Sequence, residues 1–303
     1  MRSYQYGGVS YANPDAVTQV ANGTATSSYA YDNNGNLTSA GSSTFSWDYN
    51  NRMTQAATQG STTTYSYDFA GNRVSQTVGS TTTIYPNKFY SITSTTIGAN
   101  TYATTTVYVW NGDTLIATID QPLINGSATG TAATRYIHAD HLGSTNIVSD
   151  ESGKIVADYE TYPYGETRLN QTTYPTKENR RFIGQFSDAN NLQYLNARYL
   201  NSQQGQFLSE DPVFLAVGDA RQQQQLSGRD QNTMLTDPQQ MNSYGYGRDN
   251  PMVNKDPLGL WYMQLAGTEA WGSEYATGGI RFDQYGIEYY EVDPGAGTRD
   301  LRS

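Results

Sequence analysis

The sequence predicts an all-β protein built from repeated hairpins. Charged residues make up only 15% of the 303 residues, the polar remainder is rich in Ser, Thr, Asn, Gln and Gly, and Tyr occurs 26 times. Pleated strands favour β-branched and aromatic residues, whereas turns favour Gly and Asn. One short helix is expected, around the Gln run at 222–225 and the apolar residues Leu226, Met234 and Leu235.

Three copies of a short motif predict the hairpins. Residues 29–37 and 65–73 share Tyr-x-Tyr-Asp-x-x-Gly, and residues 45–53 form a degenerate copy between them. The alternation places two aromatic rings on one face of a strand, Asp opens a turn by accepting backbone amides, and Gly supplies a positive φ. Because one hairpin buries too little surface to be stable, we expect successive hairpins to pair edge to edge into a growing antiparallel sheet.

Composition excludes several classes of protein and site. The chain has no Cys, which excludes disulfides, thiolate metal sites and cysteine nucleophiles. A net charge of −10 argues against nucleic-acid binding, and no stretch reaches the roughly eighteen apolar residues of a membrane span. The first residues lack the apolar core of a signal peptide and enter the repeat pattern at Tyr4. We therefore expect the chain to be a fragment of a longer protein, with a natural short protein as the alternative. We expect that protein to be secreted or displayed at the cell surface.

The motif resembles the signature of YD repeats, and the chain resembles the RHS/YD-repeat family. After residue 131 the similarity continues, in the family's order, through the segments of the RHS-associated core domain, which are 135–144, 150–159, 162–166, 182–185, 192–199, 205–212, 242–246 and 249–260. The resemblance thus divides the chain into a YD-repeat sheet at 1–130, the core domain at 131–260 and a short variable extension at 261–303.

The resemblance implies a fold and a function. In this family the sheet spirals into a hollow shell that the core domain closes, and longer members enclose a variable C-terminal polypeptide, often a toxin, which the core domain cuts free. The expected protein is a partial shell that encapsulates or presents its own C-terminal segment or cargo. The pattern of residues 261–303 predicts one or two strands. These residues contain no nucleophile paired with a general base.

The element at 256–260, Asp-Pro-Leu-Gly-Leu, is the candidate cleavage site. Pro257 and Gly259 favour a tight turn, which would present the peptide bond between Leu260 and Trp261 outward. Two carboxyl groups can activate water to hydrolyse such a peptide bond when one is ionised and the other is protonated. Two like charges held close together favour this state, because both groups cannot easily be ionised at once. Asp256 is one candidate for an intramolecular aspartyl autoprotease.

The sequence offers three candidates for the second carboxylate. The family resemblance places it at Asp211, in the upstream Asp-Pro element. A Gln-rich insert lengthens the spacer here and contains Asp237, and Asp249 follows further on, so both stay as weaker candidates. Most Asp-Pro pairs simply form turns, and the alternative is a purely structural or adhesive surface protein.

Other residues carry weaker hypotheses. His138 and His141 flank a predicted strand end and are expected to pack or hydrogen-bond, so neither a metal nor a cofactor is expected. Tyr-rich strand faces could contact glycans, but Tyr at this spacing more often packs against cross-strand neighbours. An open strand edge would allow self-association.

Overall fold

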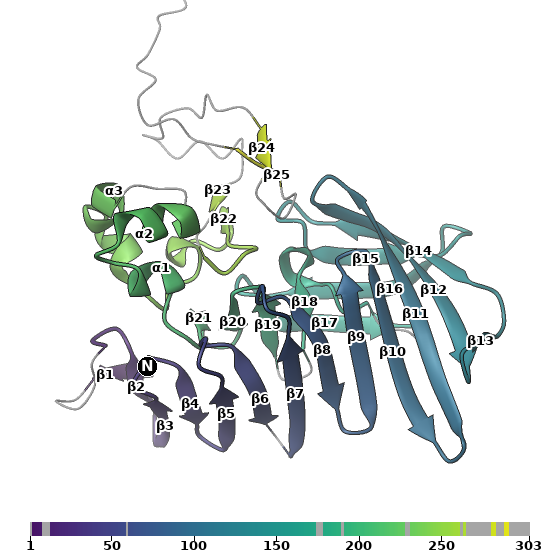
Figure 1. Ribbon diagram of the computed structural model, residues 1–303, viewed down its shortest axis with the longest axis horizontal. Coiled ribbons are helices and arrows are strands. Elements are labelled where there is room, and N and C mark those ends of the chain that lie inside the picture. Colours follow the sequence, from purple (N-terminus) through teal and green to yellow (C-terminus); the bar gives the residue numbers. More distant parts are fainter. Residues whose placement is uncertain are drawn as a thin grey trace, which may run out of the picture.

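The computed structural model describes residues 2–7, 13–58, 60–173, 178–188, 191–227 and 231–260, with short strands at 263–264, 280–282 and 288–290. A 17-stranded sheet dominates it (Figure 1). Its strands are β1 (Arg2–Tyr6), β2 (Val17–Asn22), β3 (Ala25–Tyr31), β4 (Leu37–Ala40), β5 (Ser43–Trp47), β6 (Met53–Thr58), β7 (Ser61–Tyr67), β8 (Arg73–Val78), β9 (Thr81–Asn87), β10 (Tyr90–Ile97), β11 (Asn100–Asn111), β12 (Thr114–Ile124), β13 (Ser127–Ala128), β14 (Ala133–Ala139), β15 (Thr145–Ser149), β16 (Ile155–Thr161) and β17 (Thr167–Thr172).

The remaining elements are short. A second sheet contains β18 (Phe186–Ser187), β19 (Leu192–Leu195), β20 (Arg198–Asn201) and β21 (Gln206–Phe207), and two strand pairs join β22 (Asn254–Lys255) to β23 (Met263–Gln264) and β24 (Ile280–Phe282) to β25 (Glu288–Tyr290). The helices are η1 (Phe182–Gly184), α1 (Pro212–Leu215), α2 (Ala220–Ser227), α3 (Gln231–Leu235), η2 (Pro238–Met241) and η3 (Gly247–Asp249).

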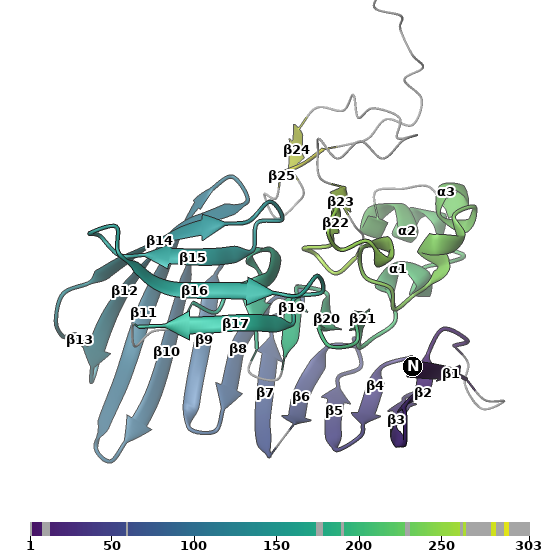
Figure 2. The same ribbon diagram turned by 180° about the vertical axis from the view of Figure 1, so that it is seen from behind.

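The large sheet is an antiparallel meander. Each strand pairs with the next one in the chain, except that β12 pairs with both β13 and β14. In Figure 2 the strands β14–β17 run across the strands β9–β12, so the sheet curves back over itself. This confirms the predicted all-β class and the curved antiparallel sheet.

One five-residue turn connects many of these strands. In the first copy Asp32 N donates to Asn36 O, Gly35 N donates to Asp32 O, and Asp32 Oδ1 accepts the amides of Asn34 and Asn36. Gly35 has a φ of +77°, a value that only glycine adopts freely. The same backbone pattern starts at Asp48, Asp68, Asp140, Asp150 and Tyr162. The repeat therefore extends past the three copies visible in the sequence, because turn geometry persists where the aromatic pattern has faded.

The second sheet packs against the large one through aromatic residues. The Phe186 ring lies 4.7 Å from the Tyr85 ring and 6.3 Å from the Tyr108 ring, and the Tyr199 ring lies 5.2 Å from the Tyr65 ring. These contacts join β18 and β20 to β7, β9 and β11, and they form one buried cluster with Leu37, Met53, Val148 and Tyr159. The core of the protein therefore lies between the two sheets.

The helices are more numerous than the one predicted. Asp211 Oδ1 accepts Val213 N, and with Pro212 at the first helical position it starts α1. Asp219 Oδ1 likewise accepts the amides of Arg221 and Gln222 at the start of α2. Helix is concentrated between residues 212 and 241, around the predicted Gln-rich region, but it is divided among three α-helices and a 3₁₀ turn. None of the helices of the described residues is long and apolar enough to cross a membrane.

The large sheet continues past residue 130, because β14–β17 extend it to Thr172. The boundary between residues 130 and 131 stays an expectation from sequence motifs, since the sheet has no break there. Within the described residues, β1 pairs only with β2 and β17 pairs only with β16, which leaves two free strand edges.

Buried charges lie at the seam between the two sheets, and Glu178 is one of them. Burial raises the pKa of Glu178 to about 7, against the opposing effect of the Arg180 amide and guanidinium. Asp120 raises this pKa further, and the Tyr108 hydroxyl also faces the site. The folded protein therefore binds a proton at Glu178 that the unfolded chain releases near its ordinary pKa of 4.5.

This shift predicts that stability falls as pH rises. The folded-state pKa is raised, so the contribution of Glu178 is fully present below about pH 4.5 and is lost as pH rises through 7. Between pH 5 and pH 8 we expect the titration of Glu178 alone to lower the free energy of unfolding by on the order of 3 kcal/mol. Urea unfolding measures this change. Glu178→Gln should flatten this slope and exceed the parent in stability at pH 8. An equal decline in parent and variant would show that Glu178 does not titrate on folding.

Candidate active site

Arg198 brings the two predicted carboxylates together. It is the first residue of β20, its side chain is 2% exposed, and its guanidinium carbon lies 3.6 Å from the centre of the Phe207 ring. One nitrogen of this guanidinium, Nη2, lies 2.9 Å from Asp211 Oδ2 and 3.4 Å from Asp256 Oδ2. Arg198 lies in the segment 192–199, which resembles a motif of the RHS-associated core domain, but the sequence alone gave this residue no role. The position of this Arg upstream of the Asp-Pro elements at Asp211 and Asp256 was the signal that could have found it.

Asp211 is held by the start of α1. Its Oδ1 accepts the amide of Val213 at 2.9 Å, which leaves Oδ2 to face Arg198. Burial raises the pKa of Asp211, whereas Arg198 and the Val213 amide act in the opposite direction. Its side chain keeps 16% of its surface exposed. Asp211 is therefore the carboxylate of the pair that solvent reaches more easily.

Asp256 is more deeply buried, with a side chain that is 3% exposed. Its Oδ1 accepts the amide of Leu260 at 3.2 Å, and its own amide lies 3.4 Å from the hydroxyl oxygen of Tyr246. Burial raises the pKa of Asp256 to about 7, Arg198 opposes this rise, and the neighbouring charge of Asp211 adds to it. Near neutral pH this carboxyl group therefore holds a proton for much of the time.

The charges of this cluster divide the roles of the two acids. One guanidinium balances one carboxylate, so the second carboxyl group is favoured in its neutral form in this buried setting. Asp256 has the higher affinity for the proton, and Asp211 has the greater access to water. A protonated acid next to an ionised one is the arrangement that can polarise a carbonyl group and activate water.

The two weaker candidates lie in another cluster. Asp237 Oδ1 accepts Gln239 N, and Asp237 Oδ2 lies 2.9 Å from Arg248 Nη2. Asp249 is exposed and accepts a hydrogen bond from Gln239 Nε2 at 2.7 Å. Asp237 and Asp249 therefore both contact Gln239, whereas Asp211 and Asp256 both contact Arg198. Of the predicted cleavage site, Leu260 is partly buried and Trp261 lies outside the described residues.

The two histidines make separate hydrogen bonds. His138 Nε2 lies 2.9 Å from Ser149 Oγ on the neighbouring strand, and His141 Nε2 lies 3.1 Å from the carbonyl oxygen of Met252. Within the described ranges, no group of three or more His, Asp or Glu side chains is arranged to hold a metal ion.

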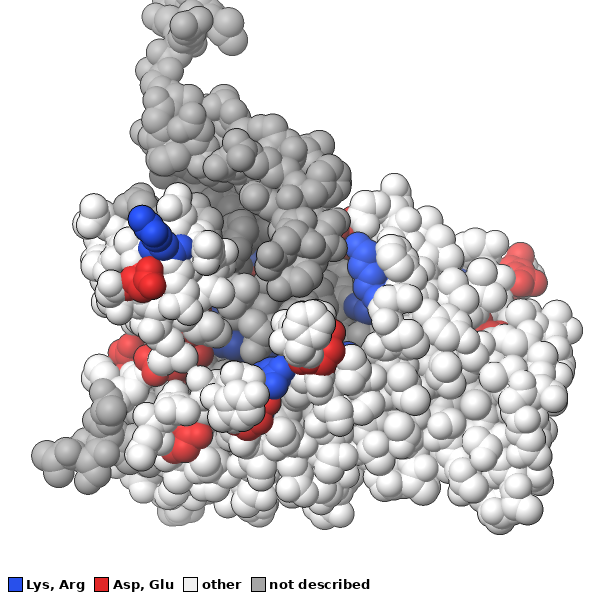
Figure 3. All heavy atoms as spheres, in the orientation of Figure 1, with Lys and Arg blue, Asp and Glu red and all other residues white. Residues whose placement is uncertain are grey.

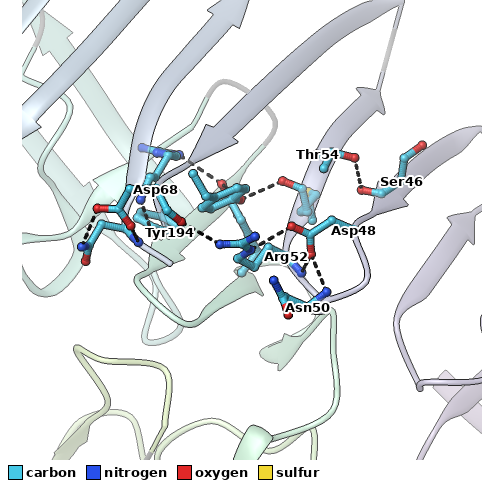
Figure 4. Close-up of polar contacts among 12 residues, drawn as sticks. Ser46, Asp48, Asn50, Arg52, Thr54, Asp68 and Tyr194 are labelled. Atoms are coloured by element: carbon cyan, nitrogen blue, oxygen red, sulfur yellow. Dashed lines mark hydrogen bonds and ion pairs between the residues drawn. The ribbon is translucent and has the colours of Figure 1, made fainter. Parts of the chain in front are cut away.

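A row of polar turns forms one rim of the sheet. Arg52 Nε lies 2.8 Å from Asp48 Oδ2, and Arg52 Nη1 donates to Asp68 O in the next turn of this kind (Figure 4). Tyr49 is 88% exposed, and Phe69 is fully exposed at the corresponding position of its turn. The repeat Tyr65 is buried instead, so exposed aromatic rings occur at these turns rather than on the packed strand face.

Charged side chains are sparse on the face shown in Figure 3, and acidic and basic groups are interspersed there. This distribution agrees with the low charged fraction of the sequence.

Comparisons with known proteins point to bacterial toxins. The chain is 29% identical over 241 residues to the tRNA3(Ser)-specific nuclease WapA of Bacillus spizizenii, covering 77% of this chain and 9% of that protein. It is 28% identical to the toxin protein Tse5 of Pseudomonas aeruginosa over 44% of this chain and 8% of the other. No family model matches the sequence. These matches support a relationship to RHS-type toxins.

A solved structure shows the same fold. The TcdB2-TccC3-Cdc42 crystal structure superposes with a TM-score of 0.60 and 18% identity, over 86% of this chain and 13% of the matched one. This likeness agrees with the shell-like curved sheet. The present chain spans about a tenth of the length of the relatives that it matches.

Proposed function

We propose that this chain is part of a secreted or cell-surface shell protein that holds a C-terminal segment or cargo and cuts itself after Leu260. The observation that carries the proposal is the contact of Asp211 and Asp256 with the same nitrogen of Arg198, with Asp256 also bonded to the amide of Leu260. The toxin relatives supply the biological setting, because a shell with a releasable segment suits a delivered toxin.

The proposed reaction is hydrolysis of one peptide bond. Ionised Asp211 takes a proton from water while the water oxygen attacks the carbonyl carbon of Leu260, and protonated Asp256 polarises the carbonyl oxygen. The tetrahedral intermediate then breaks its C–N bond, and the proton from water passes to the amine of Trp261. One water molecule is consumed, and Leu260 gains a free carboxylate. Arg198 stays charged and holds both acids in position.

Intact-mass measurement of the purified full chain tests this proposal. The expected product is a fragment that ends at Leu260 and carries the mass of one added water. A chain that stays intact through long incubation at every pH between about 4 and 8 would overturn self-cleavage.

The rate of cleavage should depend on pH in a defined direction. Asp256 must hold a proton, and burial raises its pKa to about 7, so the rate should fall about tenfold per pH unit well above 7. Asp211 must be ionised, so the rate should also fall in acid, below its raised pKa. A time course of fragment mass at fixed pH values measures this profile. A rate that rises steadily to pH 9 would contradict the proposed protonation states of Asp211 and Asp256.

The second candidate function is structural or adhesive, without catalysis. Free edges at β1 and β17 and half-exposed Tyr4 and Tyr6 favour self-association, and the exposed rings of Tyr49 and Phe69 suit a glycan surface. This alternative requires the chain to stay uncut. Concentration-dependent association in sedimentation experiments, with no fragment in the mass spectrum, would favour it.

A further inference from the structure

The segment after Asp256 lies along the turn that joins β19 to β20. Asn196 Nδ2 donates to Pro257 O at 2.8 Å, Ala197 N donates to Leu258 O at 3.1 Å, and Arg198 Nε donates to Gly259 O. Three consecutive residues, two in the turn and one at the start of β20, thus bind three consecutive carbonyl groups of the segment. All three bonds involve the backbone of residues 257–259, so they depend on where the chain lies and little on its side chains.

Gly259 fits this turn because it has no side chain. A Cβ atom at this position would lie 2.5 Å from Leu195 O and 2.9 Å from Arg198 N. Both neighbours are backbone atoms of the hairpin, which cannot move aside as a flexible side chain would. Gly259 also has a φ of +66°, which disfavours other residues by itself.

Asn196 is suited to its position for a different reason. Its φ is 60°, a left-handed value that Asn tolerates better than most residues. Its side chain is exposed, so its amide group is not needed to fill the core. The side chain can therefore be removed with little loss of packing, and its bond to Pro257 O can be tested separately.

We propose that residues 195–198 form a clamp that fixes the backbone of residues 257–259 and thereby determines which peptide bond is presented to Asp211 and Asp256. Gly259 is then the specificity-determining residue, and Asn196 is a positioning residue. The role in cutting rests on the proposed self-cleavage, whereas the binding of the segment does not.

The clamp also determines which fragment stays bound after cleavage. Its contacts end at Gly259 O, and Asp256 holds Leu260 N, so these contacts lie on the N-terminal side of the proposed cut. Hydrolysis breaks none of them. The fragment that ends at Leu260 therefore stays bound in the clamp after cleavage.

Gly259→Ala, compared with Gly98→Ala in the full chain, tests the clamp. Gly98 has a similar φ of +62°, but no atom lies within 4 Å of the position that a Cβ would take, so it reproduces the backbone strain without the collision. We expect Gly259→Ala to lower hydrogen-exchange protection of the Ala197 amide at least tenfold and to abolish or displace the cut. Gly98→Ala should leave both unchanged.

Asn196→Gly tests the positioning residue. Glycine keeps the positive φ but removes the donor to Pro257 O, so cleavage should slow about tenfold while its pH optimum and the melting temperature stay near those of the parent. Asn196→Asp should be at least as slow, because it replaces the donor by an acceptor. Asn191→Gly is the matched control, since Asn191 has a φ of 58° in another turn.

The outcomes separate the clamp from the proposed function. If the parent never cleaves but Gly259→Ala still exposes the Ala197 amide, the clamp is supported and self-cleavage is wrong. If Gly259→Ala cleaves at the parental bond and rate with the Ala197 amide still protected, the clamp is wrong.

Discussion

Asp256→Asn and Asp211→Asn should each abolish self-cleavage, with a loss of at least a thousandfold in rate. Asn keeps the volume of Asp but can neither give up a proton nor take one from water, and the two acids need both properties between them. The double variant should be no slower than either single variant, because groups that act as a unit are not additive. Fragment mass over several days measures all three variants.

Asp237→Asn is the control within the same chain. Asp237 contacts Arg248 rather than Arg198, so its replacement should leave the rate within about twofold of the parent. If Asp237→Asn alone blocks cleavage while Asp211→Asn does not, the catalytic pair has been assigned to the wrong carboxylate. Melting temperatures of all variants show whether a lost cut reflects lost fold.

Sequence reasoning predicted the hairpins well because they depend on local chemistry. Asp32, Asp48 and Asp68 each precede a Gly or Asn at the position that needs a positive φ, and the structure shows the same bonded turn at each. The further copy at Tyr162 lacks the Asp signal altogether. Its turn depends on Gly165 and on backbone bonds that the aromatic pattern does not reveal.

The contacts within the candidate site join residues that lie far apart in the sequence, so the sequence alone does not reveal them. Asp211 and Asp256 were named from their Asp-Pro elements and the family resemblance, but their link through Arg198 could not be inferred from spacing. The Asp-Pro at Asp211 begins a helix, whereas the one at Asp256 leads into the segment held by the β19–β20 turn. Two identical dipeptides thus have different local structures, because their tertiary neighbours differ.

Packing between the two sheets supports the strand that carries Arg198. β20 carries Arg198 on one side of its hairpin and Tyr199 in the core between the sheets. The packing of Tyr199 against Tyr65 therefore fixes the strand from which Arg198 reaches the two carboxylates. Loss of the seam between the sheets should consequently affect the site as well as stability.

Arg73 is the centre of that seam, and its removal should have the largest effect on stability. Arg73 Nη1 lies 2.8 Å from Asp188 Oδ2, with both side chains at most 2% exposed. Aromatic rings surround the guanidinium, the nearest being Tyr194 at 4.2 Å. Arg73→Met leaves Asp188 buried without its partner, so we expect a loss of about 3–5 kcal/mol in the free energy of unfolding.

The control pair is Arg168 and Glu160, which are 62% and 38% exposed and 3.0 Å apart. Because solvent screens such a pair, Arg168→Met should change stability by less than about 1 kcal/mol. Denaturant unfolding of both variants provides the comparison, and similar losses in the two would contradict a specific role for the buried pair.

Acid should partly rescue Arg73→Met, and this distinguishes a lost charge partner from lost packing. Burial already raises the pKa of Asp188, and Arg73 is the main opposing influence, so the variant raises that pKa further. A raised folded-state pKa contributes stability at low pH that is lost as pH rises through it. The deficit of Arg73→Met relative to the parent should therefore shrink near pH 5 and widen near pH 8. A deficit that is the same at both values would show that Arg73 stabilises the seam by packing on its aromatic neighbours and not by its charge.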